Sequence, residues 1–184
     1  RQTAIAHLLD WIAANPPLRG INWTSMLELA FRALSWMWAL ALFADEATEP
    51  EQPWMSDVVA ALDRQLRHIE QNLSYYFSPN THLLGEALAL YVGGRSLPFL
   101  RRARHYADRG RTILVDEIAR QIGADGGHLE RSTHYHRYTL DFYLLALSVA
   151  RVRADPVAAR FEAGVSRLAH AARLLSDDTG RIPH

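Results

Sequence analysis

Two residue types are missing from this 184-residue chain, because it contains no cysteine and no lysine. Without cysteine, disulfide bonds and thiolate metal sites are excluded, although an oxidising compartment is still allowed. Without lysine, all 20 cationic residues are arginine, whose planar guanidinium suits paired hydrogen bonds to carboxylate or sulfate. The 20 acidic residues bring the net charge to zero, so no basic surplus indicates a nucleic-acid or anionic membrane partner.

Long apolar runs are also missing, since the longest unbroken one covers residues 36–44. That length predicts no membrane-spanning segment. The composition is 49% hydrophobic and 22% charged, as is typical of a globular protein, and 184 residues can form one domain with a buried core. The chain starts without Met and ends in a polar turn, so we expect it to be part of a longer protein.

The remaining pattern is helical throughout, with no convincing strand. Apolar residues recur at three- and four-residue spacing in seven segments, which are separated by proline, glycine or polar breaks. The predicted helices cover residues 3–14, 25–44, 53–76, 81–92, 98–122, 132–153 and 156–175. The predicted fold class is therefore all-α.

Solvated and buried helices alternate along the chain. The first, third, fifth and seventh have one apolar stripe, whereas the second, fourth and sixth are apolar nearly all round. Short connections make successive helices antiparallel, so the three buried helices should run parallel in an inner layer. Their starts then share one end, the N-terminal rim, which is fed by the loops 20–23, 78–82 and 125–136. Free backbone N–H groups and helix dipoles favour an anionic ligand there.

The third rim loop opens a stretch that is unusually rich in titratable groups. Residues 125–143 contain three histidines, one glutamate, two arginines and three tyrosines. Ser132 and Thr133 are good N-cap residues and explain part of the pattern as a helix start. Capping does not require the histidines. A metal site is disfavoured, because His134 and His136 at i, i+2 face different sides of a helix and no thiolate is available.

Two further features of the second helix and its entry loop allow specific predictions. We expect Trp36 and Trp38 to be core residues, whereas Trp23, on a loop, fits core packing and sugar stacking equally well. Glu28 and Arg32 lie one turn apart in an otherwise apolar helix. They predict a charge pair buried in the core, because a buried charge requires a partner.

Three short motifs follow one another along the chain. They are G-I-N-W at 20–23, followed by Glu28 and Arg32, then N-T-H-L-L-G-E-A at 80–87, and G-G-H-L-E-R-S at 126–132, followed by Tyr135 and His136. Together they resemble the heparinase II/III-like polysaccharide lyases, which include heparin-sulfate and alginate lyases. The resemblance implies an incomplete α/α toroid of antiparallel helical hairpins, with 1–184 as a single domain and a β-sandwich following in the longer protein. It also implies a periplasmic or secreted location.

Lyases of this kind cleave a glycosidic bond beside a uronic acid by β-elimination. The sugar carboxylate must be neutralised before its neighbouring carbon loses a proton, and the leaving oxygen must be protonated. The resemblance implies that Asn80 and His82 neutralise the carboxylate and that Tyr135 is the acid/base residue, with no metal and no cofactor. It further predicts substrate contacts from Asn22, Trp23, Glu86, Glu130 and His136.

One position departs from the family pattern. Thr81 stands beside His82 where the characterised lyases typically have Asn-Asn-His. Another catalytic histidine of the family would come from beyond residue 184, which would leave these residues inactive on their own.

Two other functions fit the same residues. An α/α-toroid glycoside hydrolase would need two opposed carboxylic acids, which Glu86 and Glu130 could supply. A noncatalytic glycan-binding or helical scaffold module needs neither. The expected partner of a lyase is an acidic polysaccharide.

Overall fold

The computed structural model describes residues 1–44 and 53–182, and within them the regular structure is helical. The helices are α1 (Gln2–Ala14), α2 (Met26–Phe43), α3 (Pro53–Gln71), α4 (Thr81–Ser96), α5 (Ala103–Gln121), α6 (Thr133–Val152) and α7 (Ala158–Leu175), with one 3-10 turn, η1 (Ile21–Trp23), before α2. In these described ranges β-pairing is limited to one bridge between Ile122 and His128. The predicted all-α fold class is confirmed.

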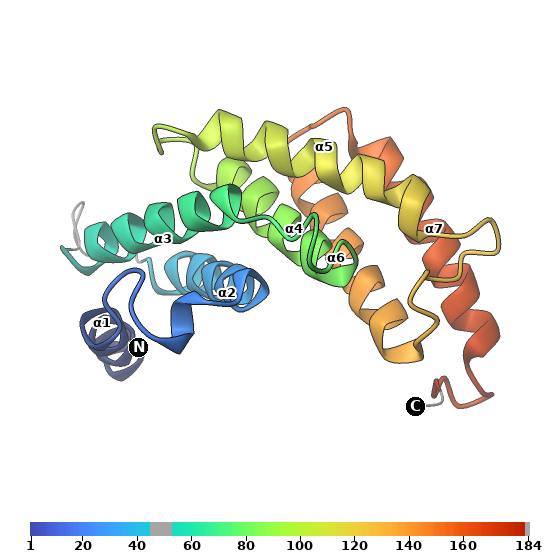
Figure 1. The fold of residues 1–184 in the computed structure, drawn as a ribbon, viewed down its shortest axis with the longest axis horizontal. Helices are drawn as coiled ribbons and strands as arrows, with labels where there is room; N and C mark the ends of the chain where they lie inside the picture. The colour runs from blue at the N-terminus through green and yellow to red at the C-terminus, as the bar shows by residue number, and fades with distance from the viewer. Residues whose placement is uncertain (45–52, 183–184) are drawn as a thin grey trace.

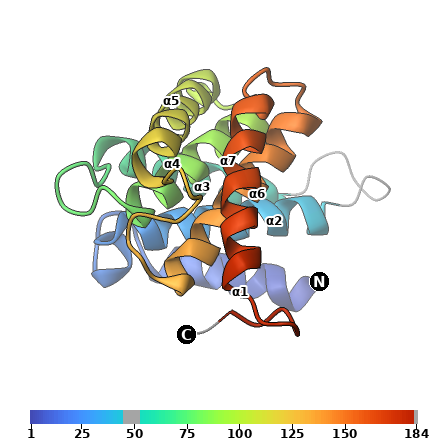
Figure 2. The same ribbon diagram turned by 90° about the vertical axis from the view of Figure 1, so that its right-hand side faces the viewer.

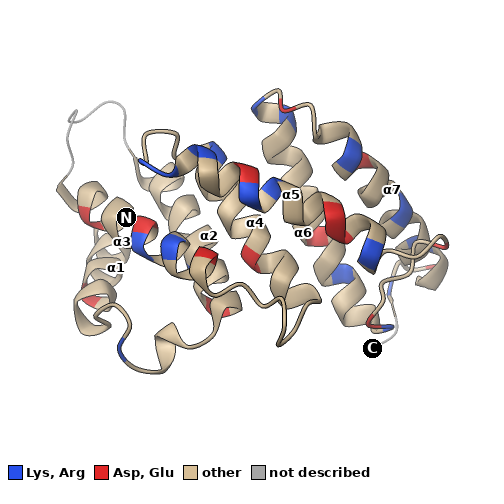
Figure 3. Cartoon of the chain, turned by 45° about the horizontal axis from the view of Figure 1, so that its top comes forward, with Lys and Arg blue, Asp and Glu red and all other residues tan. Residues whose placement is uncertain are grey.

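The fourth helix lies at the centre of the molecule. Residues 83–94 of α4 are all buried, and α4 contacts α2, α3, α5 and α6. The chain advances from α1 at one end to α7 at the other, with α3, α5 and α7 on the outside of the inner helices (Figures 1 and 2). Charged residues are concentrated on α3, α5 and α7 (Figure 3). The alternation of outer and inner helices was correctly predicted.

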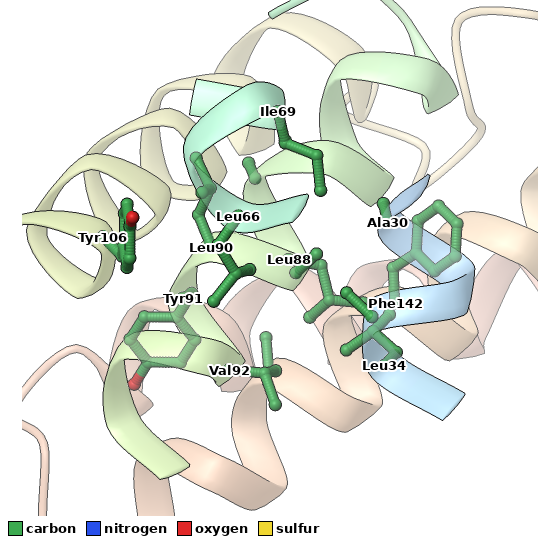
Figure 4. Close-up of a cluster of buried hydrophobic side chains, with 14 of the residues drawn as sticks. Ala30, Leu34, Leu66, Ile69, Leu88, Leu90, Tyr91, Val92, Tyr106 and Phe142 are labelled. Carbon is green, nitrogen blue, oxygen red and sulfur yellow. The ribbon is translucent and has the colours of Figure 1, made fainter. Parts of the chain in front are cut away.

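Apolar side chains of the inner helices interlock around α4. Phe142 of α6 lies beside Ala30 and Leu34 of α2, and Leu88 of α4 is close to them (Figure 4). Leu66 of α3 packs against α4 from another side. All five side chains are buried, and burying a large apolar side chain typically contributes about 1.5–3 kcal/mol.

The backbones of α4 and α5 approach each other unusually closely. A Cβ atom on Gly94 would clash with the carbonyl oxygen of Ala103, and one on Gly110 would clash with the carbonyl oxygen of Ala87. Glycine therefore serves here to let two helices touch, not to end one. For this reason α4 continues to Ser96, beyond the end predicted from its glycine pair.

Two other predicted boundaries are displaced. The third helix ends at Gln71, not at residue 76, and the N–H of Ser74 beyond it donates to the Glu86 carboxylate (2.8 Å). The fifth begins at Ala103, not at residue 98, because residues 97–102 form turns. Residues 72–80 and 97–102 are therefore the connections at the two ends of α4.

The second helix differs from its prediction in two respects. By length and composition alone it could cross a membrane, contrary to the sequence-based expectation, although 44% of it is buried inside the protein. Trp36 is buried, as predicted, with its ring 5.4 Å from that of Trp11. Trp38 is 55% exposed, so its predicted core position is wrong. Residues two apart point to different sides of a helix, and only one of the pair can face the core.

Candidate active site at the N-terminal rim

The three inner helices start at the same end of the inner layer. A Cβ atom on Gly85, in the second turn of α4, would meet Leu27 at the start of α2 and Phe142 of α6. Glu130, just before α6, accepts hydrogen bonds from the N–H (3.2 Å) and hydroxyl (2.9 Å) of Thr81 at the start of α4. The predicted shared rim is therefore present.

Each inner helix begins with a side-chain cap. The hydroxyl oxygens of Ser25 and Ser132 accept hydrogen bonds from backbone N–H groups three residues further on. The carboxamide oxygen of Asn80 accepts from the N–H of His82 (3.2 Å) and the hydroxyl of Ser78 (3.0 Å). These caps satisfy N–H groups that the helix itself leaves unpaired. In Asn80 the cap occupies the oxygen and leaves the amide NH₂ as the group that can donate to a ligand.

His82 and Tyr135 present open side chains at this rim. His82 is half-buried and makes no side-chain hydrogen bond to residues 1–44 or 53–182. It lies one turn before Gly85, on the face of α4 that meets α2 and α6. Tyr135 is 41% exposed, and its ring lies 5.5 Å from that of His134. Its hydroxyl also has no hydrogen-bond partner in the described part of the chain.

Other predicted site residues are engaged by the protein itself. Glu86 is fully buried and accepts from the N–H (2.8 Å) and hydroxyl (2.6 Å) of Ser74. Burial raises the pKa of Glu86 above its ordinary 4.5, and the two Ser74 hydrogen bonds oppose that shift. His136 is 3% exposed and bonds through Nε2 to the carbonyl oxygen of Leu168 (2.9 Å). As substrate contacts, Glu86, Glu130 and His136 stay predictions; in the structure their polar atoms hold loops and helices.

A buried network joins two of the rim loops. His128 accepts from the N–H of Glu130 through Nδ1 (3.4 Å) and contacts the Gln121 carboxamide oxygen through Nε2 (3.0 Å). Gln121 Nε2 donates to Glu117 (2.8 Å) and reaches the carbonyl oxygen of Asn80 (3.3 Å). Burial lowers the pKa of His128, which favours a neutral ring that donates from Nε2. No sequence pattern marks Gln121, an isolated amide in an arginine-rich helix.

The departure at position 81 has a structural role. Thr81 is only 1% exposed, and its hydroxyl points at Glu130. Its side chain therefore faces the interior and links two rim loops. The side-chain amide available to a ligand on this segment is that of Asn80, beside the open ring of His82.

The first rim loop is held by Asn15. Asn22 donates to the Asn15 side-chain oxygen (2.6 Å), and the Trp23 indole N–H reaches the Asn15 carbonyl oxygen (3.4 Å). Trp23 is 7% exposed. Of the two interpretations of Trp23, the structure favours core packing, while a substrate contact from either residue stays a prediction.

Arg32 has partners other than the expected one. Its guanidinium lies 4.4 Å from the Trp11 ring centre and 5.4 Å from that of Trp23, and it donates to the Gln65 carboxamide oxygen (2.8 Å). Glu28 is exposed, so the predicted charge pair buried in the core is wrong. Burial lowers the pKa of Arg32, and the Glu28 charge opposes this effect. Aromatic faces and amide oxygens satisfy the cation without a second buried charge.

Exposed apolar side chains lie on the rim loops or directly before them, which the sequence analysis missed. Tyr76 is 101% exposed and Phe77 90%, between α3 and α4. Ile21 is 79% exposed on the first loop, and Leu129 50% on the third. The aromatic pair was missed because the third helix was predicted to continue to residue 76, whereas it ends at Gln71. The rings of Tyr76 and Phe77 offer flat apolar surfaces to the carbon face of a sugar.

Across residues 1–44 and 53–182, no group of three or more His, Asp or Glu side chains is arranged to hold a metal ion.

Residues 1–172 match the family model described as the heparinase II/III N-terminus. The chain belongs to this family. It is 32% identical to a heparin-sulfate lyase of Bacteroides thetaiotaomicron over 140 aligned residues. This alignment covers 73% of this chain and 19% of that relative. It is 31% identical over 84 residues to a heparin-sulfate lyase of Bacteroides stercoris, covering 46% of this chain and 13% of that relative.

Solved structures of the family share the fold. The crystal structure of heparinase III superposes with a TM-score of 0.79 at 26% identity, over 95% of this chain and 27% of that one. Heparan sulfate lyase HepC from Pedobacter heparinus gives a TM-score of 0.72 at 23% identity, over 97% of this chain and 28% of its own length. The fold is the incomplete α/α toroid expected from the sequence. This family member thus spans under a third of the length of these relatives.

Proposed function

We propose that this chain is the N-terminal toroid of a polysaccharide lyase that cleaves a heparin- or heparan-sulfate-like glycan by β-elimination. Membership of the family and the two heparin-sulfate lyases among the relatives support this proposal. The observation that carries it is the open set of Asn80, His82 and Tyr135. These side chains keep donor or acid/base groups free of other partners among the described residues, at the starts of two helices in contact.

In the proposed reaction the start of α4 binds the uronate carboxylate. The amide of Asn80 and the ring of His82 donate to it, and the helix dipole adds favourable potential. Spreading the carboxylate charge makes the C5 proton of the uronic acid more acidic. Tyr135 then transfers the proton: its deprotonated oxygen accepts the C5 proton, the C4–O bond breaks as a C4–C5 double bond forms, and the Tyr135 hydroxyl so formed gives the proton to the leaving oxygen.

The proposal includes a β-sandwich and one further catalytic histidine outside these 184 residues. Its support is that the chain covers only 19% of one heparin-sulfate lyase and 27% of heparinase III. Export to the periplasm or cell exterior would bring the enzyme to its polysaccharide.

The environment of the two carboxylates disfavours a hydrolase. Glycoside hydrolases need two carboxyl groups open to the sugar, roughly 5–9.5 Å apart. Glu86 is fully buried on Ser74, and Glu130 is bound to Thr81. Glu86 cannot protonate or attack a glycosidic bond without breaking its contacts with Ser74, and in Glu130 the oxygen Oε1 is already taken by Thr81, so the two do not form a pair of open carboxyl groups.

Product analysis of the full-length protein tests the proposal. Incubation with heparan sulfate should produce an unsaturated uronate, seen as a rise in ultraviolet absorbance, together with new reducing ends. New reducing ends without that absorbance would mean hydrolysis. Binding without either product would mean a glycan-binding module. Alginate, tested in parallel, shows whether sulfated glycans are preferred.

A further inference from the structure

A cationic groove lies on the outer surface, where the end of α3 meets the start of α5. Its volume is about 380 Å³. Arginine and histidine provide most of its lining, which consists of Arg67, Glu70, Gln71, Arg101, Arg102, His105 and Arg109. We call it the α3–α5 groove. Charged positions on both helices are visible in Figure 3.

The ion pairs inside the α3–α5 groove leave positive charge unbalanced. Glu70 binds both Arg102 (2.8 Å) and His105. Arg101 and Arg109 have no ion pair with any residue of the described ranges. Arg109 lies over the Tyr75 ring, with 5.7 Å between the guanidinium carbon and the ring centre. The groove therefore has one acidic side chain and several basic ones, two of them unpaired.

The groove is separate from the N-terminal rim. Arg101 and Arg102 follow the C-terminal end of α4, whereas Asn80 caps its start. An α-helix of 16 residues is roughly 24 Å long, which is about the distance that separates Arg101 and Arg102 from Asn80. Arg109 is nearer to the rim, because its neighbour Gly110 packs against Ala87 in the second turn of α4. A ligand that touches both Arg101 and the rim must therefore be several sugars in length. The loop between Gln71 and Asn80 connects them along the chain and displays the exposed Tyr76.

We propose that the α3–α5 groove is an accessory binding site for the sulfate or carboxylate groups of a long acidic glycan. The choice of ligand rests on the proposed function. Guanidinium groups bind planar and tetrahedral oxyanions through paired hydrogen bonds, and Arg102 is already held in place by Glu70. Such a site would hold one part of a chain while another part occupies the rim, and would raise the effective concentration of cleavable bonds there.

Charge-matched double variants of the full-length protein test this site. Arg101→Ser/Arg109→Ser removes the two unpaired cations of the groove. Arg104→Ser/Arg160→Ser removes two exposed arginines that do not line it. Affinity is measured by calorimetry for long heparan sulfate and for a short oligosaccharide of the same composition, at low and high salt.

We expect the groove variant to bind long chains roughly fivefold more weakly, with short-oligosaccharide binding unchanged and the difference lost at high salt. The control should match the wild type. Equal losses in both double variants, equal losses for both chain lengths, or no loss would each overturn the proposal. Parallel titrations with alginate separate carboxylate from sulfate recognition. Binding is measured without turnover, so a missing unsaturated product would count against the lyase activity and not against the groove.

Discussion

The surface of the N-terminal rim and the layer directly beneath it use similar residues in opposite ways. On the surface, His82 and Tyr135 have side chains without hydrogen-bond partners among the described residues. Beneath it, Glu86 and His128 are buried and fully engaged. A titratable side chain near a helix start is therefore a candidate for chemistry only when the protein leaves its polar atoms free. The buried groups hold the connecting loops, since Glu86 binds Ser74 and His128 binds Gln121 and Glu130.

The largest expected effect comes from one hydroxyl on the rim surface. Tyr135→Phe in the full-length enzyme should lower turnover by a factor of about 10²–10⁴, since it removes positioned acid/base catalysis, and should leave thermal stability unchanged. Tyr143→Phe is the matched control on the same helix. Tyr143 is buried, and its hydroxyl donates to the Leu114 carbonyl oxygen (2.8 Å). That control should lose about 0.5–1.5 kcal/mol of stability and keep its turnover. If Tyr135→Phe lowered stability and Tyr143→Phe lowered turnover, the roles assigned to these two tyrosines would have to be exchanged.

The next effect is a loss of support under the rim. Gln121→Leu leaves His128 and Glu117 without a hydrogen-bond partner they now have, at a cost of about 1–3 kcal/mol for each buried group left unpaired. Turnover should also fall, because the loops bearing Asn80 and Glu130 lose one of their connections and keep only the hydrogen bonds between Thr81 and Glu130. Urea unfolding and steady-state rates measure the two effects. If stability fell and turnover were untouched, the network would be structural only.

A smaller effect should appear in the pH dependence of stability. The pKa of Glu86 is raised in the folded protein, chiefly by burial, so its stabilising contribution is complete below about 4.5 and is lost as pH rises through the folded value. Glu86→Gln cannot titrate. Its free energy of unfolding should therefore improve relative to wild type as pH increases from 4.5 toward neutrality. If the free energies of unfolding of the two proteins changed with pH in the same way, the pKa of Glu86 would not be raised by burial.

The smallest effect is expected at the start of α2. Glu28 is exposed, so Glu28→Ala should change the free energy of unfolding by less than about 0.5 kcal/mol. Arg32→Met should cost more, since Arg32 donates to Gln65 and to the Asn22 carbonyl oxygen between two tryptophan rings. Denaturant titration of both variants provides the comparison. Equal losses of unfolding free energy in the two variants would support the charge pair between Glu28 and Arg32 that the sequence predicted.

Much of the architecture could be predicted because it depends on local patterns. Apolar periodicity identified seven helices and separated the inner from the outer ones, and caps such as Asn80 marked where they start. Helix ends were less accurate. At Gly94 the usual signal for termination is overridden by contact with another helix, which a single sequence does not show.

Residue types in the site were easier to predict than their orientation. The motifs identified Glu86, Glu130 and Thr81, but the direction of each side chain depends on partners far away in the sequence. Thr81 and Glu130, for example, are 49 residues apart, and Gln121 reaches Asn80 across 41 residues. Only the folded chain brings such partners together.

The close contact between α4 and α5 bears on the order in which the domain assembles. These helices are neighbours in the chain, joined only by residues 97–102, and they share the most extensive helix–helix contact among the described residues. Closing so short a connection costs little chain entropy, whereas α2 must find α4 across a much longer separation. The α4–α5 hairpin is therefore the part expected to fold early. Gly94 and Gly110 allow the close contact between the two helices of this hairpin, and the other helices then pack on the hairpin.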